Sequence, residues 1–456
     1  MIQENNKTYL FEQMPIPRAV MELSIPMVVT SLIMVVYNLA DTFFVGMLND
    51  PVQNAAVTLA YPVMLAFNAV NNLFGVGTSS MMSRCLGRRD YEMVRTSSAF
   101  GFYGAVFSGI AFSLGCSVFN RPLLNLLGAD ATTWETTAAY MLWTVSCGAV
   151  PSILNVVQAQ IVRSEGSSLH ASIGSISGCV LNIILDPIFI LPWGLNMGAA
   201  GAGLATFLSN CAACGYFLVL ARVKRGQTFV CLDIRKLKNL NREVVLGVLG
   251  VGVPASIQNL LNVVGSTILN NFTAAFGAAA VAAMGIASKL NMLPIQVCLG
   301  FGQGIMPLVS YNYASGNRSR MKNGVTFSMG IIVPVMLTVT VVYWFCATPL
   351  VHLFIDNGEI IAYGTRFLRG LCLGMTFFSI DFTAVGVFQA LGMGRLALLF
   401  AVLRKVVLEM PLLFLLNALF PLYGLAYAQC VAELILAIAA VVMLLRIFRQ
   451  SSPSSR

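Results

Sequence analysis

The sequence predicts an all-α membrane protein whose twelve spanning helices form two pseudo-symmetric six-helix lobes. Three observations predict this fold: an apolar composition, long apolar segments along the whole chain, and landmarks of the first half that recur in the second. Of the 456 residues, 57% are apolar and 10% are charged, whereas a soluble domain carries roughly 25% charged residues. The mean hydropathy is +0.81. A water-soluble fold cannot bury this much apolar surface, so soluble enzymes, disordered chains, fibrous repeats and single-pass receptors are excluded.

Twelve segments are long enough to span a bilayer, which takes about 20 mainly apolar residues. Lipid offers the backbone no hydrogen-bond partners, so the segments must be helices or strands of a closed barrel. Barrel strands alternate apolar and polar residues, whereas Leu434–Leu445 is continuously apolar, which favours helices. The expected spans are residues 23–48, 55–82, 96–119, 137–161, 171–192, 198–221, 245–272, 279–308, 325–348, 364–391, 396–420 and 423–446.

The distribution of basic residues predicts the orientation. Residues 1–20 carry four charged side chains and lack the apolar core of a cleavable signal, so we expect the first span to insert uncleaved. With the N-terminus inside, 21 of the 27 basic residues fall in inside segments, three in outside segments and three within spans. We therefore expect a multi-pass protein of the cell (plasma) membrane with both termini in the cytoplasm. The net charge of +9 follows from this bias, and no nucleic-acid partner is expected.

The chain divides into an N-lobe at residues 1–222, a cytoplasmic linker at 223–243 and a C-lobe at 244–456. The linker carries six basic and two acidic residues. An even number of spans per lobe gives both lobes the same orientation, which is a parallel repeat. We expect a cleft between the lobes and transport by alternating access. Five landmarks of the first half recur in the second at nearly constant offsets. They are Pro26 with Pro254 (offset 228), Ala55–Val57 with Ala279–Val281 (224), Gly75–Gly77 with Gly300–Gly302 (225), Leu86–Arg89 with Ser315–Arg318 (229), and Asp186–Pro187 with Met410–Pro411 (224).

Several kinds of chemistry are excluded by residues that the chain lacks. No lysine follows a glycine, so a phosphate-binding P-loop cannot occur. Any transport must then be passive or driven by an ion gradient. Only His170 and His352 are present, which excludes a histidine-rich metal site. Cys211 and Cys214 form a CxxC pair inside an apolar segment, where small packing residues are expected. We expect no cofactor and no metal other than a coupling Na⁺.

Two carboxyl groups of the N-lobe are the main candidates for ion coupling, because charges at membrane depth are functional candidates by default. Asp41 lies in the first span and Asp186 in the fifth, about 23–27 Å from the cytoplasmic start at 1.5 Å per residue. No basic residue lies within the N-lobe spans. Lone carboxyl groups in a low dielectric hold protons near neutral pH, and they can equally hold a cation.

The neighbours of these acids supply further oxygen atoms. Asn182 lies four residues before Asp186 and shares its helix face. Pro187 frees the carbonyl group of Ile183 from its helical hydrogen bond, so an amide, a carboxylate and a carbonyl are available to a small cation. In the first span, Tyr37 and Asn38 lie within one turn of Asp41, and Pro26 gives that helix a place to bend. The alternative is that the acids only join helices through hydrogen bonds.

The C-lobe spans carry compensating charges. Apart from Arg366, Arg369 and Arg446 at the ends of spans, they hold Asp381, Glu409 and Glu433 together with Lys289, Arg404 and Lys405. Away from the span ends their formal charge is therefore zero, against −2 in the N-lobe spans. Lys405 and Glu409 are four residues apart, and we expect a structural pair. This asymmetry favours the N-lobe as the coupling site. Asp381 remains a secondary carboxylate, and four amides could line a substrate cavity or join helices: Gln258, Asn259, Asn262 and Gln303.

Residues 181–190, LNIILDPIFI, are followed by GAAGAGLAT at 198–206. These motifs resemble those of the multidrug and toxic compound extrusion (MATE) family, closest to its bacterial MepA-like branch. Pro26 with Asp41, LFGVG at 73–77, Leu86–Gly87 and FQALG at 388–392 also resemble this family, and the resemblance covers nearly the whole chain. The Asn-x-x-x-Asp-Pro motif of the fifth span is its most specific part.

The resemblance implies export of cationic, amphipathic drugs in exchange for H⁺ or Na⁺. It implies that Asp41, Asn182 and Asp186, with Tyr37 and Thr206 nearby, form an N-lobe cation site, and it implies a V-shaped outward-open state. Asp381 resembles a tenth-span carboxylate of another branch, one residue out of register, and the seventh and eighth spans have no acid of the kind that some relatives carry. Small organic cations and the lipid bilayer are the expected partners of a functional monomer.

Three other functions are less compatible with the sequence. A lipid-linked oligosaccharide flippase of the same superfamily would need a cationic cavity for pyrophosphate, and the N-lobe spans lack basic residues. A membrane-embedded enzyme would need a reactive cluster, and neither histidine has an obvious partner, so we do not expect an enzyme. A channel fits poorly with a two-lobe repeat, which favours rocking. The sequence does not distinguish H⁺ from Na⁺ and does not identify the drugs.

Overall fold

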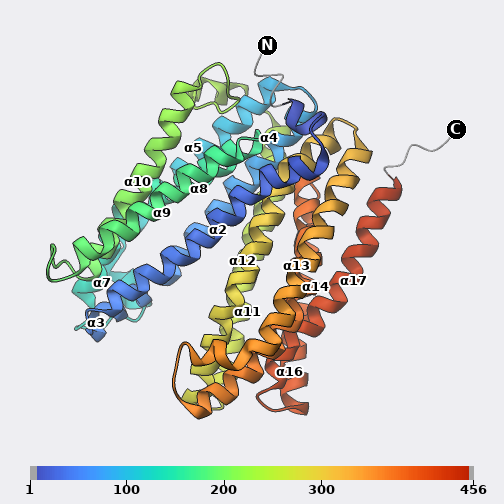
Figure 1. Cartoon of the computed structure of the whole chain (residues 1–456). Helices are drawn as coiled ribbons and strands as arrows, with labels where there is room; N and C mark the ends of the chain where they lie inside the picture. The colour runs from blue at the N-terminus through green and yellow to red at the C-terminus, as the bar shows by residue number, and fades with distance from the viewer. Residues whose placement is uncertain (1–7, 451–456) are drawn as a thin grey trace. The chain divides into compact units, whose positions relative to one another are not determined.

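The computed structural model describes residues 8–450, and this range is helical, with no β-strand. Nine of the expected spans are single helices (Figure 1). They are α2 (Ile16–Gly46), α5 (Tyr91–Val118), α9 (Ser168–Ile190), α10 (Ala199–Val223), α11 (Arg242–Ala274), α12 (Ala278–Ala314), α13 (Arg318–His352), α14 (Gly358–Ala390) and α17 (Gly424–Gln450).

The other three expected spans each contain a π-helical turn. The second consists of α3 (Pro51–Val70), η1 (Asn71–Val76) and α4 (Gly77–Gly87). The fourth consists of α7 (Trp134–Met141), η2 (Leu142–Cys147) and α8 (Ala149–Ser164), with a bend of 47° after Cys147. The eleventh consists of α15 (Gly394–Val402), η4 (Leu403–Glu409) and α16 (Met410–Leu419). Short π-helical turns inside α-helices frequently mark functional sites.

The predicted twelve-helix membrane fold is confirmed. Within residues 8–450, ten helices are long and apolar enough to cross a membrane, and the bent fourth span makes eleven. The remaining span, 394–419, is helical over its full length. Composition alone does not mark it as a span because it contains four charged residues, Arg395, Arg404, Lys405 and Glu409. The protein is therefore a multi-pass membrane protein.

The chain forms two compact units, and α2 and α11 each pass from one unit to the other about halfway along the helix. One unit consists mainly of Val29–Ser256, and the other contains Phe11–Val28 together with the chain from Ile257 onward. In the second unit, Ser24 of α2 donates its hydroxyl to the carbonyl oxygen of Phe301 at 3.5 Å. In the first unit, Ser256 of α11 donates to the carbonyl oxygen of Ala69 at 2.5 Å.

A proline stands at each crossing point between the units. Pro26 lies two residues before Val28 on α2, and Pro254 lies two residues before Ser256 on α11. Both helices continue through their prolines, although a proline inside a helix removes one backbone hydrogen bond. The predicted lobes, 1–222 and 244–456, follow the sequence repeat and stay a prediction. The boundaries of the packing units differ from the lobe boundaries, because each unit boundary falls about halfway along α2 or α11.

The turns reproduce the repeat in the backbone. Four positions of the first half with positive φ have a counterpart in the second half: Asn49 with Gly277, Arg89 with Gly316, Gly166 with Gly392, and Asn196 with Leu422. Subtraction gives offsets of 228, 227, 226 and 226. Asp90 and Asn317, each following one of these residues, cap α5 and α13 through their side chains. The structure thus repeats its helix ends as well as its hydrophobic segments.

One sequence match was out of register by two residues. The match of Gly87 with Gly316 predicts an offset of 229, whereas the backbone gives 227. The reason is that Arg89, with φ of 61°, adopts the left-handed conformation that Gly316 adopts in the second half with φ of 81°. Glycine takes this conformation without steric cost, so aligning the two turns by glycine placed Gly87 opposite Gly316.

The linker is part of the first unit and packs against its helices. The carboxylate of Glu165 accepts hydrogen bonds from the backbone nitrogen of Phe229 at 2.8 Å and from the hydroxyl of Thr228 at 2.9 Å. Lys236, in the short helix η3 (Ile234–Asn239), forms an ion pair of 2.7 Å with Glu92 of α5. The linker is therefore an ordered segment attached to α5 and to the end of α8.

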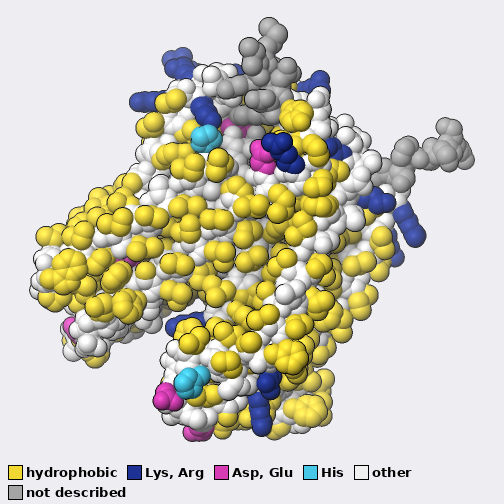
Figure 2. Space-filling view, viewed as in Figure 1, with side chains coloured by type: hydrophobic (Ala, Val, Ile, Leu, Met, Phe, Trp, Pro, Cys, Tyr) yellow, Lys and Arg dark blue, Asp and Glu magenta, His cyan; other side chains and the backbone are white. Residues whose placement is uncertain are grey.

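The surface matches a lipid environment. Figure 2 shows apolar side chains over the flanks of the helices and basic side chains near helix ends. Large apolar side chains are widely exposed, including Phe107 at 74% and Phe345 at 76%. Such exposure would be unfavourable in water and is favourable against lipid, which agrees with the membrane assignment.

Candidate functional site

The predicted cation-site residues come together inside the first unit. Tyr37 and Asp41 lie on α2, Asn182 and Asp186 on α9, and Thr206 on α10. All five belong to the Val29–Ser256 unit, so their arrangement does not depend on the second unit.

Small residues allow α9 and α10 to pack closely beside this site. A β-carbon on Gly178 would lie 3.1 Å from Cβ of Ala213 and 3.3 Å from the carbonyl oxygen of Ser209. Figure 1 shows the two helices running side by side. Because the backbones approach this closely, Asn182 on α9 reaches Thr206 on α10.

Asp186 is fully buried and is held by its neighbour one turn earlier. Its side chain has no exposed surface, and Asn182 is 1% exposed. In the amide orientation that satisfies both neighbours, the nitrogen of Asn182 donates to Oδ2 of Asp186 at 2.8 Å, and its oxygen accepts from the hydroxyl of Thr206 at 3.3 Å. Asn182 thus links the carboxyl group to the next helix.

Asp41 faces this group from α2. Its Oδ1 atom is buried and has no hydrogen-bond partner. Asp41 lies close enough to Asp186 for electrostatic interaction. Tyr37, one turn before Asp41, lies beside the side chain of Thr206. A buried carboxyl oxygen without a hydrogen-bond partner, such as Oδ1 of Asp41, is chemically suited to bind a proton or a small cation.

Tyr140 completes the site, although the sequence analysis did not single it out. It lies on α7, is 7% exposed and interacts electrostatically with Asp41, Tyr37 and Asp186. A buried phenol beside two carboxyl groups can donate a hydrogen bond to either. The available signal was weak: Tyr140 is a polar aromatic residue inside the fourth predicted span.

Neither carboxyl group has a basic partner in the part of the chain that the structure describes. Across residues 8–450, no lysine, arginine or histidine forms an ion pair with Asp41 or Asp186. The same range contains no group of three or more His, Cys, Asp and Glu side chains suited to a transition metal. The donor set consists of carboxyl, amide and hydroxyl oxygens, which suits a proton or a hard monovalent cation.

The helix-bending candidates lie within continuous helices. Pro26 is inside α2 at the crossing between the units, and Pro187 directly follows Asp186 inside α9. Their placement beside a crossing point and beside a site carboxyl group agrees with where the sequence analysis located them. The bending itself stays a prediction.

Asp381, the secondary carboxylate of the sequence analysis, has a basic partner. Its carboxyl group is fully buried and forms an ion pair with Arg404, and its role in transport stays a prediction. The sequence analysis placed Arg404 in the same lobe but did not pair the two residues, because they are 23 positions apart on different spans. The expected pair of Lys405 with Glu409 is confirmed at 2.7 Å.

The amides of the second unit have mixed surroundings. Gln258 is 7% exposed and accepts a hydrogen bond of 3.1 Å from Gln389, so it joins α11 to α14. For Gln258, the contact agrees with the alternative stated in the sequence analysis, in which an amide joins two helices. Asn259 has a buried oxygen without a partner. Asn262 and Gln303 are half-buried, and their role in a substrate cavity stays a prediction.

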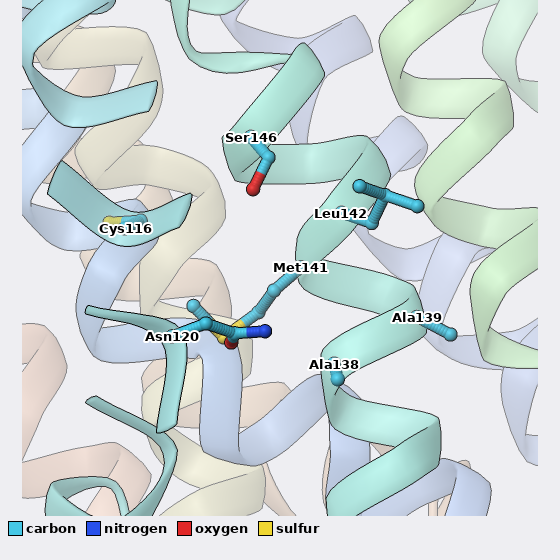
Figure 3. Close-up of a pocket in the computed structure, with 7 residues that line it drawn as sticks. All are labelled: Cys116, Asn120, Ala138, Ala139, Met141, Leu142 and Ser146. Carbon is cyan, nitrogen blue, oxygen red and sulfur yellow. The ribbon is translucent and has the colours of Figure 1, made fainter. Parts of the chain in front are cut away.

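A separate pocket of about 280 Å³ lies in the first unit, away from these residues. Figure 3 shows the pocket, which is lined by side chains of α5, α7 and η2 together with Asn120 at the start of α6 (Asn120–Leu126). Its polar lining consists of Cys116, Asn120 and Ser146. None of the predicted site residues lines it, so the pocket is distinct from the carboxyl site.

The repeat and the membrane fold agree with the family comparison. The model of the MatE family matches residues 26–188 and 254–415, one match in each half of the chain. The chain belongs to the MatE family. The boundaries of the two matches reproduce the internal repeat, since they begin at Pro26 and Pro254.

Known proteins of the MatE family resemble this chain over nearly its whole length. The multidrug export protein MepA of Staphylococcus aureus (strain MRSA252) is 33% identical over 448 residues, which is 97% of each chain. The MepA protein of Staphylococcus saprophyticus is 32% identical over 97% of each chain. Among solved structures, an outward-facing multidrug resistance MATE family transporter matches with a TM-score of 0.89 and 26% identity, covering 95% of this chain and 96% of that one.

Proposed function

We propose that this MatE family protein is a secondary active multidrug exporter that exchanges cationic or amphipathic drugs for H⁺ or Na⁺ by alternating access. One observation carries the proposal: the buried carboxyl group of Asp186 and the half-buried one of Asp41, whose Oδ1 atom is buried, interact in the first unit without a basic partner among the described residues. The names of the relatives, multidrug export proteins and a multidrug resistance transporter, support the same function.

The proposed cycle uses these carboxyl groups as the exchange site. A drug binds while the carboxyl groups are free, and a proton or sodium ion arriving from outside neutralises them and displaces the drug. Asn182, Thr206 and Tyr37 hold the oxygens of the site in place for the incoming cation. Each charge that crosses the membrane supplies about 2.3 kcal/mol per 100 mV.

Pro26 is proposed to couple the site to the crossing of α2 between the units. The proline removes one backbone hydrogen bond from the helix, and Asp41 lies fifteen positions further along the same helix. Loading of Asp41 and bending near Pro26 would then be linked mechanically through α2. Pro187 plays the corresponding role beside Asp186 on α9.

We propose that both termini face the cytoplasm, because this orientation places 21 of 27 basic residues on the inside. The N-lobe (1–222) would contain the coupling site, and the linker (223–243) would face the cytoplasm. We further propose that the protein acts as a monomer, that it takes part in no enzymatic reaction, and that its partners are organic cations and the lipid bilayer.

The test is drug transport by the purified protein in proteoliposomes with an imposed gradient. An inward-directed pH gradient and an inward-directed sodium gradient are applied separately, and export of a fluorescent cationic drug is recorded. Acceleration by one gradient supports antiport and identifies the ion. A rate of drug export that neither gradient changes would contradict the proposal.

A further inference from the structure

The second unit contains five buried or nearly buried ionisable side chains that the proposed function does not use. We call them the buried charge centre. They come from three helical segments, α14, η4 and α17, and are Asp381, Arg404, Lys405, Glu409 and Glu433. Side-chain exposure is 0% for Asp381, 2% for Arg404 and 1% for Glu433.

The positions of these residues along their helices place the centre near the middle of the membrane, by the following estimate. Asp381 is nine residues before the end of α14, and Glu433 is nine residues after the start of α17. Arg404 is ten residues after the start of α15. At 1.5 Å per residue these positions are about 14–15 Å from a helix end, which is half of a hydrocarbon core of about 30 Å. Ionisable groups at this depth are costly and are usually retained for a function.

Hydrogen bonding divides the centre into two hydrogen-bonded ion pairs and one further acid, and it leaves Oδ1 of Asp381 and Nε of Arg404 without a partner. Lys405 donates to both oxygens of Glu409, at 2.9 and 2.7 Å. The guanidinium group of Arg404 donates through one terminal nitrogen to Oδ2 of Asp381. Glu433 lies 3.4 Å from Nε of Arg404, but neither of its oxygens has a hydrogen-bond partner. Glu433 is therefore the acid without a hydrogen-bonded counter-ion.

The charges of the centre sum to −1 when every group is ionised, since three acids face two bases. A buried carboxylate without hydrogen bonds is strongly unfavourable. The aromatic rings of Phe378 and Phe382, 5.4 and 5.9 Å from the guanidinium carbon, add an apolar boundary on the α14 side. One proton on Glu433 brings the sum to zero and removes this cost.

The groups that face Glu433 support this assignment. Arg404, Lys405 and Glu409 act on it electrostatically from η4. Cys430 is its titratable neighbour on α17, and Cys372 of α14 lies beside Cys430. α16 also packs against α17 and carries no titratable side chain. Arg404 is the cation nearest to Glu433, and its terminal nitrogen is already bonded to Asp381.

We propose that the buried charge centre is a proton-binding site, in which Glu433 holds one proton and Arg404 serves as the fixed counter-ion of Asp381. Binding converts the carboxylate of Glu433 to a carboxylic acid, and release returns the proton to water. When the proton leaves, Nε of Arg404 is within ion-pair distance of Glu433 and shares its charge between the two acids. The site lies in the second unit, so the proposal is independent of the coupling role of Asp41 and Asp186.

Infrared spectroscopy of the purified protein tests the assignment, because a protonated carboxyl group has its own C=O stretching band. The background variant is Asp41→Asn with Asp186→Asn, which removes any contribution from the first unit. We expect one buried acid band at neutral pH in this background and its loss when Glu433→Gln is added. Glu359→Gln, at the exposed start of α14, is the control and leaves the band unchanged.

Two results would overturn the proposal. Absence of an acid band at neutral pH in the background variant would show that Glu433 is ionised, and this measurement does not require any change at Glu433. Persistence of the band after Glu433→Gln would assign the proton elsewhere. Glu433→Gln preserves the shape of the neutral acid, so the proposal also requires its unfolding temperature to match that of the background, and a large loss would contradict it.

Discussion

Asn182 and Asp186 lie one turn apart on α9 and are joined by a 2.8 Å hydrogen bond from the amide nitrogen to Oδ2. This contact fixes the orientation of a fully buried carboxyl group and leaves the amide oxygen to accept from Thr206 of α10. The relationship explains why an amide stands four residues before the acid. A carboxyl group that must accept and release a cation needs a fixed position and a neutral partner, and a basic partner would occupy it permanently.

Asp186→Asn should make drug binding independent of the coupling ion. If binding of one drug displaces one proton, the affinity of the unmodified protein changes about tenfold per pH unit over the range in which the exchange occurs. The amide cannot exchange a proton, so the variant should give a flat profile. Fluorescence titration of a cationic drug at several pH values measures this.

Two comparisons accompany that titration. Glu135→Gln changes an exposed acid of α7 and should keep the slope of the unmodified protein. An unchanged slope in Asp186→Asn would assign the exchange to another group, and a slope that appears with sodium concentration in place of pH would identify Na⁺ as the ion.

Thr206→Val should weaken cation binding while preserving the shape of the side chain. The substitution removes the hydroxyl that donates to the amide oxygen of Asn182 and lies beside Tyr37. Loss of one hydrogen bond costs about 0.5–1.5 kcal/mol, so the concentration of coupling ion needed for half-maximal transport should rise by up to about tenfold. Thr206→Ser, which keeps the hydroxyl, should transport normally, and equal defects in both variants would argue against a hydrogen-bonding role.

Pro26→Ala should slow transport without destabilising the protein. Alanine restores a helical hydrogen bond in α2 close to the crossing between the units at Val28, which stiffens the helix. We expect slower drug export and an unchanged or higher unfolding temperature. Pro62→Ala changes an exposed proline inside α3, away from either crossing, and should transport normally. Normal drug export by Pro26→Ala would show that the proline is not needed for transport.

Arg404→Met should destabilise the protein strongly. Removing the cation leaves the ionised carboxylate of Asp381 buried without its counter-ion, and breaking a buried ion pair in this way costs about 3–5 kcal/mol. Adding Asp381→Asn should recover part of the loss, since it removes the unpaired charge. Arg395→Met, at an exposed position of the same span, should change stability by about 0.5 kcal/mol or less. Thermal unfolding in detergent compares the four proteins, and similar midpoints for the two arginine variants would contradict this view of the centre.

Asp130 provides a pH prediction outside the membrane spans. Hydrogen bonds from the side chain of Thr132 and from the backbone and side chain of Thr133 lower the pKa of Asp130 from 3.8 to about 2. Because the folded pKa is depressed, the stabilisation is complete above pH 3.8 and is lost as the pH falls through 2. Hydrogen exchange of the 130–133 turn should therefore accelerate between these values. In Asp130→Asn the acceleration should disappear, and its persistence would assign it to another group.

The fold and parts of the first-unit site could be predicted from local patterns. Apolar segment length located the spans, and four-residue spacing placed Asn182 and Lys405 beside Asp186 and Glu409. The grouping of Asp41 with Asn182 and Asp186 came from the family resemblance, because the residues lie on different spans. The π-helical turn at Leu403–Glu409 had no signal that the sequence analysis used. The partners of Asp381 and Gln258 depend on which helices meet, so spacing along the chain could not reveal Arg404 or Gln389.

The most direct test of the central claim is gradient-driven drug export by the Asp41→Asn, Asp186→Asn double variant in proteoliposomes, beside the unmodified protein and Glu135→Gln. We predict that the unmodified protein and Glu135→Gln export the drug when the coupling gradient is imposed, and that the double variant, folded and reconstituted to the same level, does not respond to it. Export by the double variant at the rate of the unmodified protein would contradict the account.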